Sequence, residues 1–354
     1  MALGVVIGQA MKHHEAFEQA VVQKEFKCLA HAVKESREDN AEARASVVAA
    51  VCWAAFACPA AITPIYDQLA AAWLGVTTLP LNTDLDNDLD FPDAPLAPAF
   101  WQTFWSVIDE KNFDAASITQ AVAGLGGGVD PSMQALSENA AREHPGAQAA
   151  LHRPVPGHTR LEVLEALPEG SLGAVLYRML IDNGYDLEVL DRDAIQLANL
   201  PTALQYLNVR ILQMHDIWHL AAGYSTSGSD EIAISAFQLA QFGHNYSAMF
   251  LAVVLMKSHV GLPQAFPLLL QLILEAWVHG RQTPALMEIE WEQEWHQTID
   301  QVRSRFGIRP FQSVLPTDML EVFGSGTRWS RLKTGWQLSR LLKRLKAGEQ
   351  LYSS

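Results

Sequence analysis

Apolar residues recur every three or four positions along most of the chain, and strict alternation of β-branched residues is absent. This spacing predicts helices, because residues three or four apart lie on one face of an α-helix. Runs of good helix formers begin after Asp and Asn residues and end at Gly or Pro residues, which is where helices start and stop. The pattern therefore predicts an all-α fold, arranged as a helical bundle.

Several helix ends can be predicted from these start and stop signals. One helix begins after Asn40 and ends at Cys58, where prolines follow. A second, rich in apolar residues, ends near Gly223. The next helical run begins after a cap at Ser229 or Asp230 and is expected to continue to residue 256.

Two proline-rich segments divide the chain. Residues 79–98 form an acidic, proline-bounded stretch expected to be a solvated linker, and a second proline-rich joint follows near residue 150. We therefore expect an N-terminal helical region at 1–150, a helical domain at 151–310 and a basic amphipathic tail at 311–354.

The longest apolar stretch predicts a buried helix and not a membrane span. Residues 45–66 are rich in alanine and interrupted by Pro59 and Pro64, whereas a spanning helix needs about 20 strongly apolar residues. The first residues lack the charged and apolar regions of a signal peptide. A soluble protein is the expectation.

Composition and charge exclude one class of partner. The formal net charge is −14, and nucleic-acid binding needs a basic face, so we expect no nucleic-acid partner. The three cysteines are odd in number and irregularly spaced, which indicates reduced thiols in a cytosolic compartment.

The main candidate site is a polar cluster within an apolar helical segment. His215 and His219 are four residues apart and therefore share one helix face, with Asp216 about 100° round the helix. After a short turn, Glu231 falls in the first turn of the next helix, where an antiparallel arrangement returns it to the histidines. Two nitrogens and two carboxylates suit a divalent metal with one open position.

A structural alternative is a pair of hydrogen-bonded core histidines, which is the commoner outcome for two histidines four apart. The two carboxylates favour the metal site, because burying four ionisable side chains without a cation is costly.

The spacing His-Asp-x-x-His, followed after eleven residues by Glu, resembles the motif of the coenzyme Q (ubiquinone) biosynthesis protein four family. It stands here as His215, Asp216, His219 and Glu231. The segments "LPEGSLGAVLYRMLIDNGYD", "GYSTSGSDEIAISAFQLAQ" and "GRQTPALMEIEWEQEWHQTIDQVRSRFGI" resemble the family's flanking regions, so that the resemblance covers about residues 161–308.

The resemblance implies an all-helical protein that binds a divalent metal, usually zinc, through those four residues. It also implies a prenylated aromatic lipid as substrate and other quinone-biosynthesis proteins as partners. The implied reaction is oxidative removal of the ring carboxylate, which leaves a hydroxyl. If O₂ is the oxidant, iron suits the chemistry better than redox-inert zinc, and manganese, cobalt and magnesium stay open. Two alternatives are a non-catalytic lipid-binding scaffold with a structural metal and a metal-dependent phosphohydrolase.

Four further residues are candidates for substrate binding. Glu275 and His279 are four apart on one predicted helix, Gln241 follows the Glu231 segment, and Tyr224 follows the expected helix end. A helix-end or surface position is the commoner explanation for Glu275 and His279, and packing is for Tyr224, whereas capping or packing is an equal alternative for Gln241. A polyprenyl tail would need an apolar tunnel, which the segments 247–256 and 266–274 would line if they face each other.

The segment 328–346 carries seven Lys or Arg and no acid, so that the rest of the chain carries −21. Trp329, Leu332 and Trp336 share one side of its predicted helix. This composition indicates either a membrane-surface helix or a helix docked on the acidic body of the same chain. The expected location is the cytoplasm, peripheral to the inner membrane, and a homodimer is compatible with the sequence.

Overall fold

The computed structural model describes residues 13–26, 28–81, 85, 90–110, 121–122, 124–185, 197–316, 319, 322 and 327–352. All regular elements in these ranges are helices, and β-pairing in them is limited to one isolated bridge between Ser171 and Thr298. The predicted all-α fold is confirmed. No helix in the described ranges is long and apolar enough to cross a bilayer.

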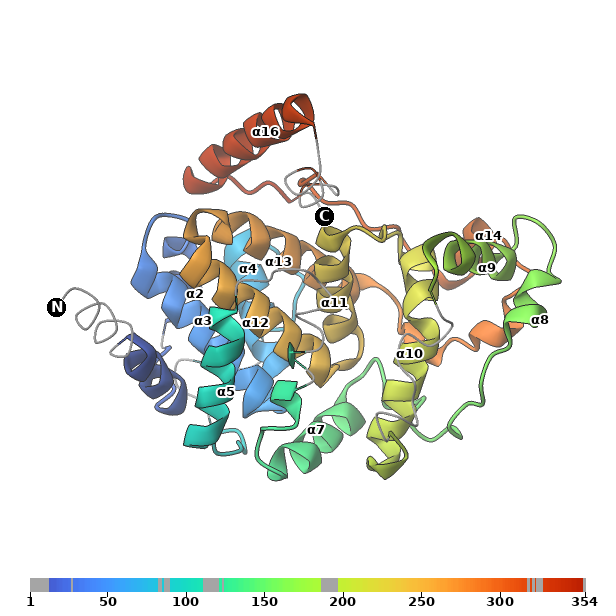
Figure 1. Ribbon diagram of the computed structural model, residues 1–354, viewed down its shortest axis with the longest axis horizontal. Helices are drawn as coiled ribbons and strands as arrows, with labels where there is room; N and C mark the ends of the chain where they lie inside the picture. Colours follow the sequence, from blue (N-terminus) through green and yellow to red (C-terminus); the bar gives the residue numbers. More distant parts are fainter. Residues whose placement is uncertain are drawn as a thin grey trace.

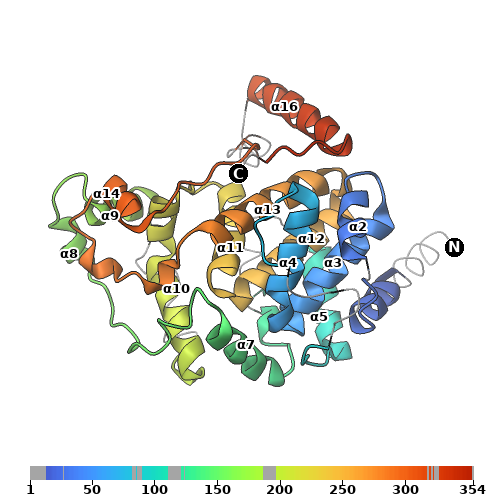
Figure 2. The same ribbon diagram turned by 180° about the vertical axis from the view of Figure 1, so that it is seen from behind.

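Figures 1 and 2 show how the helices follow one another along the chain. Their bounds are α2 (Leu29–Glu35), α3 (Ala41–Phe56), α4 (Ile62–Leu74), α5 (Pro98–Asp109), α7 (Ser132–Glu143), α8 (Leu161–Glu165), α9 (Leu172–Asn183), α10 (Thr202–Ala222), α11 (Gly228–Phe242), α12 (Asn245–Gly261), α13 (Phe266–Gln282), α14 (Ile299–Phe306) and α16 (Arg328–Lys346). Single 3₁₀ turns lie at Pro59–Ala61, Leu197–Asn199, Pro263–Ala265, Leu286–Glu288 and Trp291–Gln293.

Two predicted boundaries are confirmed by cap geometry. The side chain of Asn40 accepts a hydrogen bond from the backbone N–H of Ala43 at 3.0 Å, which starts α3. Helix α10 ends where Gly223 adopts a φ of 80°, a left-handed conformation that glycine reaches without steric cost.

Other boundaries differ from the prediction. Helix α3 ends at Phe56, two residues before Cys58, because the chain turns into a 3₁₀ turn that begins at Pro59. Helix α11 starts at Gly228 because Ser227, not Ser229 or Asp230, is its cap.

The expected run to residue 256 is two helices. Gly243 ends α11 with a φ of 66°, and α12 begins at Asn245 in a new direction. This break gives α11 and α12 separate orientations within the bundle.

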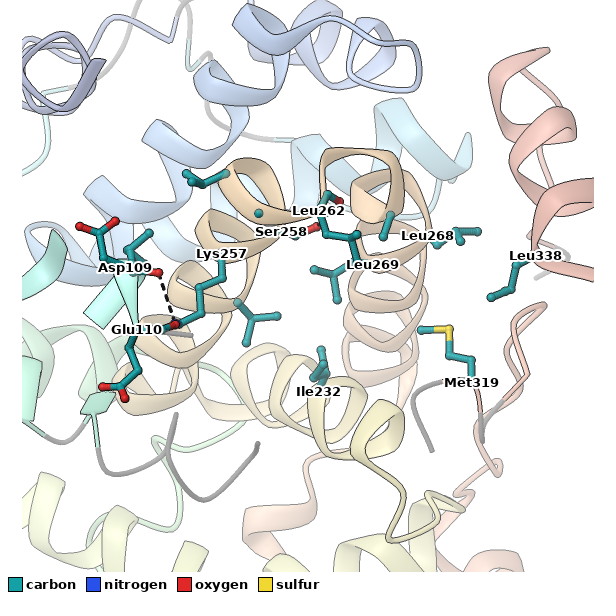
Figure 3. Close-up of a pocket in the computed structure, with 15 residues that line it drawn as sticks. Asp109, Glu110, Ile232, Lys257, Ser258, Leu262, Leu268, Leu269, Met319 and Leu338 are labelled. Atoms are coloured by element: carbon teal, nitrogen blue, oxygen red, sulfur yellow. Dashed lines mark hydrogen bonds between the residues drawn. The ribbon is translucent and has the colours of Figure 1, made fainter. Parts of the chain in front are cut away.

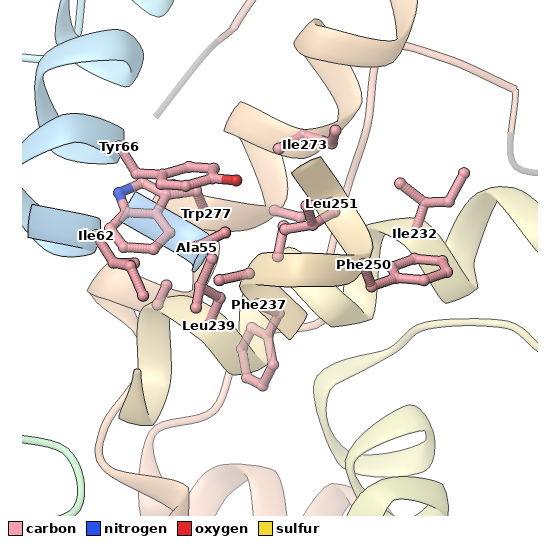
Figure 4. Packing of buried hydrophobic residues seen from close by; sticks show 14 of the residues in the cluster. Ala55, Ile62, Tyr66, Ile232, Phe237, Leu239, Phe250, Leu251, Ile273 and Trp277 are labelled. Carbon is pink, nitrogen blue, oxygen red and sulfur yellow. The ribbon is translucent and has the colours of Figure 1, made fainter. Parts of the chain in front are cut away.

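The core is built around α13, which packs against α4, α11, α12 and α16, while α12 packs against α3 and α5. The N-terminal helices therefore share one hydrophobic core with α11–α13. Figure 4 shows this contact, in which the rings of Tyr66 on α4 and Trp277 on α13 stack at 4.8 Å. The division of the chain at residues 150 and 310 stays a prediction.

A buried ion pair also joins α4 to α13. The Asp67 carboxylate accepts hydrogen bonds from the indole N–H of Trp277 at 2.8 Å and from Arg281 at 3.1 Å. The Asp67 side chain is almost fully buried. Because a buried carboxylate needs such partners, this contact fixes the register of α4 on α13.

Candidate metal centre

Helices α10 and α11 bring together the four predicted ligand residues. His215 and His219 lie in the last two turns of α10, and Glu231 lies in the first turn of α11. The connecting turn is fixed by Ser227, whose hydroxyl accepts from the Asp230 N–H, and by Asp230, whose carboxylate accepts from the Ser225 N–H. The short, hydrogen-bonded turn places the start of α11 beside the end of α10 (Figure 1).

The ligand atoms are close to one another. The two Nε2 atoms of His215 and His219 are 3.0 Å apart. Glu231 places one carboxylate oxygen 3.5 Å from Nε2 of His215 and the other 3.4 Å from Nε2 of His219. Ligand atoms of His215, His219 and Asp216 all lie within 4.8 Å of one another.

These separations fit one divalent ion. With bonds of about 2.05 Å, two ligand atoms of zinc would lie about 3.3 Å apart in a tetrahedral site and about 2.9 Å apart in an octahedral one. The distance of 3.0 Å between the two histidines lies within that interval, and the distances of 3.4 and 3.5 Å from the histidines to Glu231 lie just above it. The donor set of two imidazoles and two carboxylates is also the set that divalent transition metals prefer.

The cluster is buried on one side and open on the other. The His219 side chain is 1% exposed, whereas those of His215 and Glu231 are 22% and 31% exposed. An ion held there would therefore have an accessible position on the side of His215 and Glu231. Catalytic metal sites keep such a position for water or substrate.

The electrostatics of the cluster favour a cation. Burial raises the pKa of Asp216, and the charge of Glu231 raises it further, although His215 opposes both. Burial alone would lower the pKa of His215, but the hydrogen bond and charge of Glu231 and the charge of Asp216 raise it. Burial and the charge of His215 lower the pKa of His219 to about 4. The two carboxylates therefore favour positive charge at His215, whereas burial disfavours it at His219.

Glu231 is the ionised carboxylate of the cluster. Burial opposes its ionisation, but the hydrogen bond from His215 and the charges of both histidines lower its pKa overall. An anionic Glu231 between two imidazoles is ready to bind a cation without first losing a proton.

An apolar cavity of about 520 Å³ lies on another side of α11 (Figure 3). Its wall includes Ile232, the residue after Glu231, and is completed by α5, α12, α13, α16 and Met319. Most of the lining is aliphatic, with Asp109, Glu110 and Lys257 at one end. Val254 on α12 and Leu268 and Leu269 on α13 line it, so the two expected tunnel segments do face a common space.

The comparison with known proteins covers the helices that carry this site. Residues 100–312 match the family model described as coenzyme Q (ubiquinone) biosynthesis protein Coq4. The chain belongs to the Coq4 family. The resemblance noted from the motif is thereby confirmed, and it extends upstream of residue 161.

Relatives from animals and fungi are similar to this chain over about half its length. A mitochondrial COQ4 homologue from Homo sapiens is 27% identical over 185 residues, which cover 50% of this chain and 66% of the human protein. A mitochondrial coq4 protein from Talaromyces stipitatus is 24% identical over 163 residues, covering 46% of this chain and 53% of that protein. Both are named as ubiquinone biosynthesis proteins, and the chain spans less than two thirds of the length of each.

One solved structure is also similar. It is a crystal structure named as a candidate ubiquinone biosynthesis protein from Nostoc punctiforme, with 25% sequence identity and a TM-score of 0.45. The match covers 60% of this chain and 97% of that one.

Within this Coq4 chain, Gln238 supports the metal cluster and was not among the predicted site residues. Its side-chain amide lies 2.6 Å from Nδ1 of His215. The atom of Gln238 at this distance is Nε2, an N–H donor, so Nδ1 of His215 accepts in this orientation. If Nε2 of His215 bound a metal, Nδ1 would carry the proton, and the Gln238 amide would turn so that its oxygen accepts. Gln238 is seven residues after Glu231 and therefore on the same face of α11, so the i, i+7 spacing was the available signal.

Tyr185 is a second site neighbour that sequence reasoning missed. It follows the glycine cap of α9 and is 42% exposed. Its pKa is raised by burial first and then by the charges of Glu231 and Asp216, which places the phenol near the two carboxylates. Tyr185 follows α9, whereas the ligand residues lie on α10 and α11, so no pattern in the local sequence could connect them.

Tyr224, His279 and Glu275 form part of a different contact. The Tyr224 hydroxyl donates to Nδ1 of His279 at 2.7 Å, and Nε2 of His279 donates to the Arg309 carbonyl at 2.7 Å. Glu275, one turn earlier on α13, accepts from the Ser313 hydroxyl at 2.5 Å. In the described residues, these three side chains make no hydrogen bond or ion pair with the ligand cluster. They hold the segment 309–316 against α13, and a role in substrate binding stays a prediction.

Gln241 stabilises the backbone that follows the end of α13. Its amide N–H₂ donates to the carbonyls of Gly280 and Thr283 at 2.6 and 2.9 Å, and its oxygen accepts from the Leu286 N–H at 2.9 Å. These three bonds occupy its donors and acceptor at the end of α13. Its predicted role toward a substrate is also untested.

Proposed function

We propose that this Coq4 family protein is a metal-dependent enzyme of ubiquinone biosynthesis that acts on a prenylated aromatic precursor. The reaction is the oxidative decarboxylation of the ring, in which the ring loses CO₂ and gains a hydroxyl; one oxygen atom of O₂ enters the hydroxyl, and an external two-electron donor with two protons reduces the other to water. The observation that carries the proposal is the cluster of His215, His219 and Glu231 nitrogen and oxygen atoms 3.0–3.5 Å apart, with its open side toward solvent.

His215, Asp216, His219 and Glu231 would hold the metal. A bound divalent ion supplies positive charge to a carboxylate or phenolate oxygen of the ring, and so favours the charge that develops there. Zinc suits the donor set, but with O₂ as the oxidant a redox-active ion such as iron suits the chemistry better, and manganese, cobalt or magnesium stay open.

The residues around the cluster have distinct tasks in this proposal. Gln238 fixes the ring plane and tautomer of His215 through Nδ1. Buried His219 closes the inner side, so that a substrate approaches only from the side of His215 and Glu231. Tyr185 is 42% exposed and feels the charges of Glu231 and Asp216, so its phenol would donate a hydrogen bond to an anionic ring substituent.

The aliphatic cavity would hold the prenyl tail. Its volume of about 520 Å³ lies within the usual range of ligand pockets, and its walls are aliphatic side chains that require no hydrogen-bonding partner. Because a prenylated ring is dissolved in lipid, the protein would work at the periphery of a membrane, together with the enzymes that make and consume the ring.

Metal analysis and native mass spectrometry of the purified protein test the first part of the proposal. We expect one equivalent of divalent metal, lost in His219→Ala and strongly reduced in Glu231→Gln. His296→Ala is the matched control, because His296 is an exposed histidine away from the cluster, and it should keep the metal. Equal metal content in all four proteins would refute the assignment of the ligands.

Turnover of a prenylated hydroxybenzoate under O₂ tests the second part. The metal-loaded protein should release CO₂ and form the hydroxylated ring, and Glu231→Gln should abolish both. If the loaded protein binds the lipid and retains its metal but forms no product, the chain is a lipid-binding scaffold with a structural metal instead.

A further inference from the structure

Helix α16 lies on the outside of the bundle and contacts it through one face (Figure 1). Thr334, Leu338 and Leu345 are buried on that face, which packs toward α13. These positions are spaced by four and seven residues, so they form one stripe along the helix. The stripe is the apolar contact of α16 with the body.

The opposite face of α16 exposes large apolar side chains. Trp329, Leu332 and Trp336 are 83%, 67% and 61% exposed, which are the three highest values among the large apolar residues of the described chain. Their spacing of three and four residues places them in one row. Monomeric soluble proteins rarely present such a row, and grouped exposed apolar residues mark interaction surfaces.

The exposed row is flanked by positive charge. Lys333, Arg340 and Lys343 lie on the same outward half of the helix, as 100° per residue requires. The Arg340 guanidinium lies over the Trp336 ring at 4.6 Å, and none of the three basic residues makes an ion pair with a described part of the body. The helix carries seven positive charges in a chain whose remainder carries −21. The charges of Lys333, Arg340 and Lys343 therefore face outward, away from the acidic body.

The buried face of α16 covers the apolar cavity. Leu338 lines the cavity together with Met319, Leu268 and Leu269 (Figure 3). One side of α16 is thus a wall of the cavity, and the other side is an exposed apolar and basic surface. The helix also lies beyond residue 312, where the match to the Coq4 family model ends, so the surface belongs to the extension of this chain.

We propose that α16 docks this protein on anionic lipid bilayers. Trp329, Leu332 and Trp336 enter the interface between headgroups and acyl chains, while Lys333, Arg340 and Lys343 bind lipid phosphates. Basic amphipathic helices with tryptophan on the apolar face bind membranes in this way, and aromatic rings favour the headgroup level. Docking in this orientation leaves only the width of α16 between the bilayer surface and the cavity that Leu338 lines. The use of that position to take up a prenylated substrate rests on the proposed function, whereas the docking itself does not.

Vesicle co-sedimentation of the full chain tests the proposal, with phosphatidylcholine vesicles and with vesicles that also contain phosphatidylglycerol. We expect binding to the anionic vesicles that weakens with added salt. The variant Trp329→Ala/Leu332→Ala/Trp336→Ala should lose this binding. The matched control is Val22→Ala/Leu81→Ala/Ile181→Ala, which removes three other exposed apolar side chains and should bind as the unmodified chain does.

A charge variant separates the electrostatic contribution. Lys333→Gln/Arg340→Gln/Lys343→Gln keeps the apolar row and should weaken binding on the order of 100-fold, since each basic residue near an anionic surface contributes about fivefold. All six substituted positions on α16 point outward, so circular dichroism and thermal unfolding should be unchanged.

Three outcomes would overturn the proposal. They are absence of binding by the unmodified chain, equal binding by the apolar-row variant, and binding to neutral vesicles that is unaffected by salt. A dimer of the unmodified chain that becomes a monomer in the apolar-row variant, without vesicle binding, would assign the surface to a second copy instead. The metal-ligand variant His219→Ala should still bind vesicles, so that failure of the docking proposal and failure of the metal proposal are distinguishable.

Discussion

Glu275 is expected to make the stability of the protein depend on pH around neutrality. The residue is fully buried on α13, where its carboxylate accepts hydrogen bonds from Gln271 at 2.7 Å and from Ser313 at 2.5 Å. Burial raises its pKa from 4.5 to about 7, although the bonds from Ser313, Gln271 and the Val314 N–H oppose the shift. The carboxyl group is therefore protonated in the folded protein at pH values where it is ionised in the unfolded chain.

The sign and size of the effect follow from this difference. The stabilising contribution of a group whose pKa is raised on folding is fully present below the unfolded pKa of 4.5 and is lost as the pH rises through the folded pKa of about 7. A shift from 4.5 to about 7 corresponds to about 3 kcal/mol in the free energy of unfolding, most of it lost between pH 5 and pH 8.

Urea unfolding of the unmodified protein and of Glu275→Gln between pH 5 and pH 8 measures this contribution. Glutamine keeps the shape of the side chain and has no titration, so the difference in unfolding free energy between the two proteins should shift by about 3 kcal/mol in favour of the variant as the pH rises. The other titrating groups are common to both proteins, so their contributions cancel when one free energy of unfolding is subtracted from the other. A difference that stays constant over this range would refute the assignment.

Ser313→Ala is the matched control for the same experiment. It removes one hydrogen bond to the carboxylate but leaves Glu275 able to titrate. Because that bond lowers the pKa of Glu275, the pH dependence should persist in Ser313→Ala and move to higher pH.

Three further outcomes are expected. Gln238→Ala should weaken metal binding about 10–100-fold in a chelator competition without removing any ligand, and unchanged affinity would contradict its role toward His215. Arg281→Ala should lower the free energy of unfolding by about 3–5 kcal/mol, because it leaves buried Asp67 without its cation, and adding Asp67→Asn should restore part of the loss. Burial lowers the pKa of His144 and of His279 to about 4, so the stability that each contributes should be lost as the pH drops from 6.5 toward 4, and a change in unfolding free energy between pH 7 and pH 4.5 that is the same in His279→Gln as in the unmodified protein would contradict this for His279.

The features that were predictable from sequence are those set by neighbours along the chain. The stop of α10 at Gly223 depends on one left-handed residue, and the shared face of His215 and His219 depends only on helix geometry. The return of Glu231 to the two histidines required only a short turn between antiparallel helices. These are local properties, so periodicity and caps were sufficient.

The features that were missed depend on packing between distant segments. The spacing of Glu275 and His279 does place both on one face of α13, but that face meets the segment 309–316 and not the ligand cluster. Nothing in the local sequence around α13 shows where that segment passes. The break at Gly243 was likewise missed, because the apolar pattern continues across it and only the left-handed backbone ends α11 there.

Helix α11 explains why the metal cluster and the cavity occur together in this fold. Glu231 and Gln238 are seven residues apart and face α10, where one contacts both histidines and the other holds the ring of His215. Ile232, one residue and therefore about 100° further round the same helix, lines the cavity. A single helix thus supplies polar ligands on one side and aliphatic wall on the adjacent side. This arrangement suits a molecule with a polar ring and an apolar tail better than it suits either part alone.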